Sequence, residues 1–112
     1  MLTLPIKKKW FDMIASGKKK EEYREITEYY TTRFENVGLL HLFMPTDEIH
    51  QIILRNGYSK NSPTMKVNVM LTIGEGKPEW GAEPNKTYYV LHIKSIEHIT
   101  VNGVMMWRNI LR

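Results

Sequence analysis

The chain has 112 residues and no cysteine, with 16 Lys and Arg against 12 Asp and Glu, for a formal net charge of +4. This length supports one hydrophobic core, so we expect a single domain over residues 1–112. The lack of cysteine excludes disulfides and thiol catalysis. No apolar run approaches the roughly 20 residues that cross a bilayer, and residues 1–15 lack the pattern of a signal peptide. We therefore expect a cytoplasmic protein without a membrane partner.

Two short helices are expected in the N-terminal third. After a short extended lead-in, apolar residues recur at helical spacing over residues 6–14, so one helix face packs on the core, and Trp10 is expected in that core. Gly17 follows as a left-handed cap. Residues 21–24 then predict a short strand. A second helix is expected over about residues 27–34, with Thr as its first capping residue.

The rest of the chain predicts strands. Apolar residues 39–44 fit either a packed loop or a short strand, and residues 74–86 contain Gly and Pro breaks that predict an irregular loop. Strands are expected over residues 49–55, 65–73, 87–96 and 98–101. In the third of these we expect Tyr89, Leu91 and Ile93 inside, with Tyr88, His92 and Lys94 nearer solvent. The pattern predicts an α+β domain of about five to six mostly antiparallel strands that close into a small β-barrel.

Residues 16–25, SGKKKEEYRE, crowd cations and anions into the turn between the first helix and the first strand. Glu22 and Arg24 are two positions apart, so an extended chain points both to the same side. Lys19 lies where the turn can fold over them. If these side chains line a partly buried cleft, they must pair with one another, because unpaired buried charges cost several kcal/mol. An ordinary solvated surface also fits a run of this kind.

Four residues of this stretch fill the pattern G-x-K-x-x-E-x-R, namely Gly17, Lys19, Glu22 and Arg24. The pattern resembles the signature of the ASCH family (activating signal cointegrator homology). Residues 52–59 (IILRNGYS) and 74–84 (GEGKPEWGAEP) are similar to those of its short bacterial and phage members, so the resemblance reaches about residue 100. It implies a PUA-like β-barrel that binds RNA.

Such a cleft has groups suited to RNA or to a small, modified nucleotide-like ligand. Lys19 and Arg24 can hold a phosphate or a carbonyl, and Glu22 can accept a hydrogen bond from an exocyclic amine, as carboxylates do with cytosine. Gly17 shapes the turn. Two aromatic side chains for stacking and a second phosphate contact are expected in the cleft walls, from Tyr58, Trp80 and Arg55. Tyr58 could instead cover the barrel end, and Arg55 could cap a strand edge.

A small hydrolase is an alternative. Some ASCH proteins that resemble this one are amidohydrolases that deacetylate N4-acetylcytidine, with a Thr at the position that Glu22 holds here, so their Thr–Lys mechanism does not carry over. Lys19 and Glu22 could still act as an acid–base pair on a bound water, and ribonuclease activity is also described in the family. Lys19 would then need a lowered pKa, which burial beside Arg24 favours and Glu22 opposes.

A protein-interaction module is a further alternative, in which the apolar, basic tail over residues 105–112 docks another protein or a second copy. The four histidines do not have metal-ligand spacing, and no glycine-rich phosphate loop is present. We therefore expect neither a metal nor a cofactor.

Overall fold

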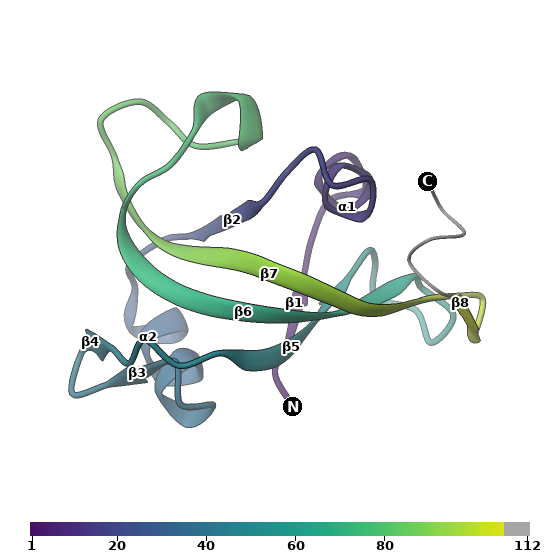
Figure 1. Cartoon of the computed structure of the whole chain (residues 1–112), viewed down its shortest axis with the longest axis horizontal. Coiled ribbons are helices and arrows are strands. Elements are labelled where there is room, and N and C mark those ends of the chain that lie inside the picture. Colours follow the sequence, from purple (N-terminus) through teal and green to yellow (C-terminus); the bar gives the residue numbers. More distant parts are fainter. Residues whose placement is uncertain (107–112) are drawn as a thin grey trace.

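A curved, mixed β-sheet forms the centre of the fold (Figure 1). The computed structural model describes residues 1–106. In chain order its elements are β1 (Thr3–Pro5), α1 (Lys8–Ala15), β2 (Glu21–Arg24), α2 (Glu28–Asn36), β3 (Leu40–His41), β4 (Met44–Pro45), β5 (His50–Arg55), β6 (Thr64–Glu75), the 3-10 turn η1 (Pro78–Trp80), β7 (Thr87–Val101) and β8 (Val104–Met106). The predicted α+β class, with two short helices in the N-terminal third, is confirmed.

The main sheet has six strands in the order β1-β5-β6-β7-β2, with β8 paired to the end of β7. Among the described strands only the β1–β5 pair is parallel, so the predicted mostly antiparallel sheet is confirmed. The 12 residues of β6 and the 15 of β7 form its longest ladder, and two register shifts there, between Lys66 and Val67 and between Asn68 and Val69, help the sheet to curl.

The sheet stays open between its end strands, β1 and β2. Within residues 1–106 no backbone ladder joins these two strands, so the closed barrel that we expected is not formed. A side chain spans the gap instead, because Nη2 of Arg24 on β2 donates to the carbonyl of Pro5 on β1 at 2.6 Å. The opening is therefore bounded by β2, the strand that carries Glu22 and Arg24.

The larger of the two hydrophobic clusters among residues 1–106 fills the inside of the curl. It joins Phe11 and Ile14 of α1 and Phe34 of α2 to the inward residues of the sheet. The alternation predicted for β6 is confirmed, with four buried side chains at Met65, Val67, Val69 and Leu71. Ile73, expected with them, is 43% exposed because β6 there extends past the core.

Two sequence expectations for β7 are wrong. Tyr88, placed near solvent, is buried, because the loop after β6 folds back and packs Ala82 against Tyr88, Tyr23 and Val90. Residues 98–101 continue β7 rather than forming a separate strand.

The predicted strand over residues 49–55 is found as β5, beginning one residue later.

Residues 39–44, which fitted a loop or a strand, form most of the small β3–β4 hairpin. Its two turn residues, Leu42 and Phe43, have positive φ angles of 49° and 66°. Of the predicted docking tail, Met105 and Met106 belong to β8, and residues 107–112 lie outside the described residues. Neither helix of the described chain is long and apolar enough to cross a membrane.

Candidate functional site

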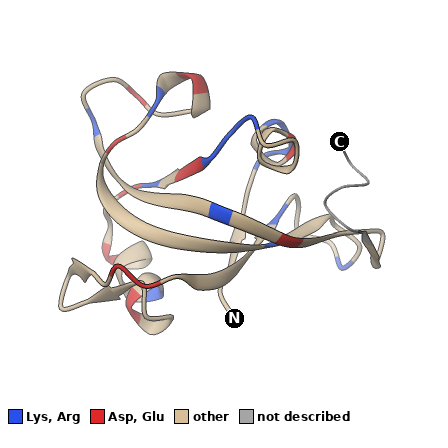
Figure 2. Ribbon diagram, in the orientation of Figure 1, with Lys and Arg blue, Asp and Glu red and all other residues tan. Residues whose placement is uncertain are grey.

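The connection from α1 to β2 positions the charged cluster, which consists of Lys19, Glu22 and Arg24. α1 ends where the N–H of Gly17 donates to the carbonyl of Ile14 at 3.0 Å, and the φ of 83° at Gly17 reverses the chain in a conformation that favours glycine. Figure 2 shows the cations gathered where α1 leads into β2, directly before the acidic start of that strand. β2 then pairs antiparallel with β7, which fixes its direction. Gly17 itself borders a separate hollow beside Ile93 and Ile96 of β7.

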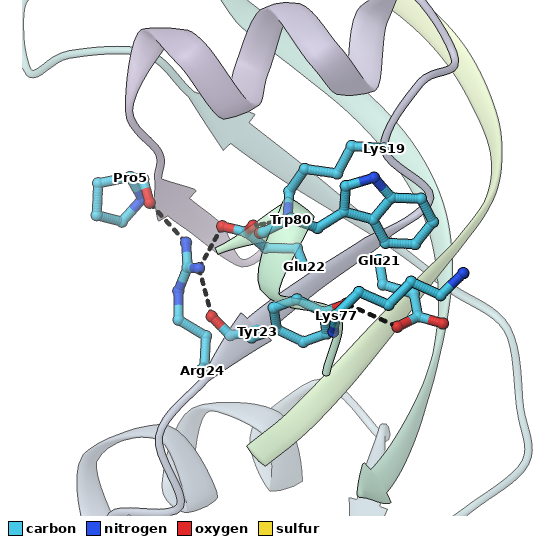
Figure 3. A network of polar contacts seen from close by, with 8 residues as sticks. All are labelled: Pro5, Lys19, Glu21, Glu22, Tyr23, Arg24, Lys77 and Trp80. Carbon is cyan, nitrogen blue, oxygen red and sulfur yellow. Dashed lines mark hydrogen bonds and ion pairs between the residues drawn. The ribbon is translucent and has the colours of Figure 1, made fainter. Parts of the chain in front are cut away.

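Glu22 lies between two cations (Figure 3). Its Oε1 is 3.1 Å from Nζ of Lys19, and its Oε2 accepts a short hydrogen bond from Nη1 of Arg24. The exposed fractions of the three side chains are 0% for Lys19, 6% for Glu22 and 11% for Arg24. The prediction that these charges pair with one another, rather than disperse into water, is confirmed.

Lys19 is sealed from solvent by the turn η1. Its ammonium donates to the backbone carbonyl of Trp80 at 2.6 Å and lies 5.0 Å from the ring centre of Trp10 and 4.8 Å from that of Tyr23. Burial lowers the pKa of Lys19, while the adjacent Glu22 carboxylate opposes the shift. Hydrolytic chemistry at Lys19 would require η1 to move away. Lys19 therefore holds Glu22 and the turn in place, and its side chain is not part of the lining of the cleft described below.

Arg24 is fixed from three directions. Nη1 donates to Glu22 and, at 2.9 Å, to the Tyr23 carbonyl, while Nη2 donates to the Pro5 carbonyl (Figure 3). A guanidinium has about five N–H donors and a carboxylate about four acceptor positions. Counted over residues 1–106, these contacts leave donor positions of Arg24 and acceptor positions of Glu22 unused, and both residues line the cleft described next.

A cleft of about 500 Å³ opens in front of this pair. Its size is in the usual range for small-molecule sites. The lining combines five aromatic rings with three acidic and three basic side chains, from Pro5, Ile6, Lys7, Trp10, Glu22, Tyr23, Arg24, Glu25, Tyr30, Trp80, Gly81, Glu83, Lys86 and Tyr88. Its formal charges balance, so the cleft is aromatic and polar and is not a basic phosphate pocket.

The predicted wall residues divide between two places. Trp80 lines the cleft through η1. Tyr58 does not, and lines an adjoining hollow with Asn56 and Gly57. Arg55 is absent from the lining of the cleft, because β1 lies between β5 and the opening. Nε of Arg55 is buried and has no hydrogen-bond partner among residues 1–106. The expectation that Arg55 and Tyr58 form walls of this same cleft is therefore wrong.

Sequence reasoning missed most of the aromatic lining. Trp10 was expected in the core; it packs at the core edge but also lines the cleft. Gly81, with a φ of 104°, lies against it, and a Cβ at that glycine would come within 3.0 Å of the indole. The other aromatic residues of the lining are Tyr23 on β2, Tyr30 on α2 and Tyr88 on β7. Helical spacing could have marked Trp10 as lying near a face boundary, but no signal in the sequence brings Tyr88 to the same place.

Comparison with protein-family models, with curated proteins and with solved structures finds no match for this chain. The resemblance to the ASCH family, and the functions that it implies, therefore stay predictions. Over residues 1–106, no group of three or more His, Asp or Glu side chains is placed to hold a metal ion.

Proposed function

We propose that the cleft binds a nucleobase that carries an exocyclic amine, as cytosine does, on RNA or on a modified nucleoside. One observation supports this more than any other: the Glu22 carboxylate and the Arg24 guanidinium are held side by side at an aromatic cleft, each with hydrogen-bonding capacity to spare. Proteins that read unpaired bases combine ring stacking with hydrogen bonds to the base edge.

The two charged groups match the edge of cytosine. The amine donates to the free acceptor positions of Glu22, and the ring nitrogen or carbonyl accepts from Arg24. Uracil has a carbonyl in place of the amine, so it would face a carboxylate with an acceptor. A matched pair of such contacts gives about 1–3 kcal/mol of discrimination between bases.

The surroundings favour a preorganised site. Lys19 and the Pro5 carbonyl hold Glu22 and Arg24 in place before a ligand arrives, so little side-chain entropy is lost on binding. The half-buried rings of Trp80, Trp10 and Tyr30 offer stacking surfaces, which contribute about 1–3 kcal/mol per base. Because the cleft charges balance, binding of a single base should depend weakly on salt.

Calorimetric titration with cytidine 5′-monophosphate and uridine 5′-monophosphate tests the proposal. We expect cytidine monophosphate to bind more tightly. Trp80→Leu should weaken that binding, and it keeps the backbone carbonyl that Lys19 uses. Tyr29→Leu is the matched control, since Tyr29 is a 55% exposed aromatic residue that does not line the cleft. Equal binding of the two nucleotides, or equal losses in the two variants, would contradict the proposal.

A further inference from the structure

A second hollow of about 340 Å³ adjoins the aromatic cleft. Three residues line both, the segment from Pro5 to Lys7 that leads from β1 into α1. On its other side the second hollow is bounded by Asn56, Gly57 and Tyr58, which follow β5. A ligand longer than one nucleotide can therefore leave the cleft over Pro5–Lys7 and enter the second hollow directly.

The loop that bounds the second hollow is held in shape by its own hydrogen bonds. The N–H of Asn56 donates to the carbonyl of Pro63 at 2.9 Å, which closes the base of the loop. Inside it, the N–H of Ser59 donates to Oγ of Ser62 at 2.9 Å. Tyr58 is 89% exposed on this loop. An aromatic ring that is left open to solvent beside a hollow offers a flat face on which a base can stack.

A cation stands on the segment that the two hollows share. Lys7 is exposed, and it forms no ion pair with any residue of the part of the chain that the structure describes. In this it differs from the cations inside the cleft, because Arg24 is paired with Glu22 and Lys86 with Glu25. Lys7 is thus the lining cation that is free to meet a phosphate between two nucleosides.

We infer that the ligand is a single strand of at least two nucleotides, with one base in the aromatic cleft, a phosphate over Lys7 and the neighbouring base on Tyr58. This inference rests on the proposed function and adds to it, because the cleft alone would accept a free nucleoside equally well. Stacking on an open tyrosine has little base preference, so we expect the neighbouring position to tolerate any base.

Calorimetric titrations with cytidine 5′-monophosphate and with the diribonucleotides CpU and UpC test the inference, because uracil lacks the amine that the cleft is proposed to recognise. Both orders are used because the strand can run in either direction. We expect one dinucleotide to bind roughly fivefold or more tightly than the mononucleotide, the lower end of the gain from stacking one base. Tyr58→Ala should remove that gain and leave the mononucleotide affinity unchanged, while Tyr58→Phe should keep it. Lys7→Ala should weaken dinucleotide binding in either direction of the strand, and Lys18→Ala, an exposed lysine outside both linings, should not.

The outcomes separate the two proposals. If cytidine monophosphate binds but neither dinucleotide binds more tightly, the second position is overturned and the base-binding cleft stands. The inference is also overturned if Tyr58→Ala weakens the mononucleotide as much as the dinucleotide. If none of the three ligands binds, both proposals fail. Corresponding deoxyribonucleotides in the same titration show whether the strand is RNA or DNA.

Discussion

Replacing Glu22 by Gln removes the anion that compensates two buried cations. The substitution keeps the size of the side chain, so it isolates the charge. It leaves the ammonium of Lys19, which has no exposed surface, beside the guanidinium of Arg24, which is 11% exposed. Arg24 retains two backbone carbonyls and Lys19 retains one, but neither retains a carboxylate partner.

Removing one partner of a buried ion pair costs about 3–5 kcal/mol, because the remaining charge is left uncompensated. Small domains have a total free energy of unfolding of only about 5–15 kcal/mol, so the loss should be plain in urea denaturation. The double variant Lys19→Met and Glu22→Gln removes the stranded ammonium and replaces it with an apolar chain. We expect this double variant to be more stable than Glu22→Gln alone.

The pH dependence has a definite sign. Burial already lowers the pKa of Lys19 from 10.5, with the attraction to Glu22 as the main opposing effect, so Glu22→Gln should lower it further. Between a lowered folded-state pKa and 10.5, the unfolded state binds more protons, and stability therefore rises with pH, by at most about 1.4 kcal/mol per pH unit. The stability deficit of Glu22→Gln should narrow as pH rises, until Lys19 of the unmodified protein also begins to lose its proton.

Glu25→Gln is the matched control. Glu25 is 61% exposed and pairs with Lys86 at 2.8 Å on the surface, where solvent screens the interaction, so we expect little change. Equal, small losses for the two Glu→Gln variants would refute the account of a buried triad. A deficit for Glu22→Gln that does not change between about pH 6 and pH 10 would refute the role given to Lys19.

Two further predictions concern the same fold. Tyr23→Phe should cost about 1–3 kcal/mol near neutral pH, because it strands the N–H of Lys77, which donates to the Tyr23 hydroxyl at 2.9 Å. Burial raises the pKa of Tyr23 in the folded state above its usual 10.0, so the contribution of its hydroxyl to the free energy of unfolding is complete below pH 10 and is lost as pH rises through the folded-state pKa. In urea denaturation, the stabilities of the unmodified protein and of Tyr23→Phe should therefore converge above pH 10. In the β3–β4 hairpin, the double substitution Leu42→Asn and Phe43→Gly should raise the free energy of unfolding by about 1 kcal/mol and so raise the thermal midpoint. Both exposed residues have positive φ angles, which Asn and Gly adopt at less cost than Leu and Phe. A lower midpoint would show that the two side chains make stabilising contacts.

The local part of the site could be predicted from the sequence. Residues 21–24 were predicted as a strand and form β2 with those bounds. The two-residue period of a strand then places Glu22 and Arg24 on one side, and the cost of burying lone charges requires them to pair with Lys19. These steps need only residues that are close in the sequence, and the structure confirms them.

The long-range part could not be predicted. The carbonyl that seals Lys19 belongs to Trp80, 61 residues further along the chain, and no local pattern indicates that contact. Arg55, expected in the cleft walls, lies on β5, and the parallel pairing of β1 with β5 puts β1 between Arg55 and the cleft. The same topology leaves the sheet open where a closed barrel was expected. Strand order depends on the packing of the whole chain and not on the pattern of any one strand.

We propose that the paired Glu22 and Arg24 recognise a base at the aromatic cleft. A crystal structure of the protein with bound cytidine 5′-monophosphate tests it most directly. We expect the exocyclic amine to lie against the Glu22 carboxylate, the ring edge against Arg24 and the base plane against Trp80. A nucleotide bound elsewhere on the surface, with the cleft empty, would contradict it.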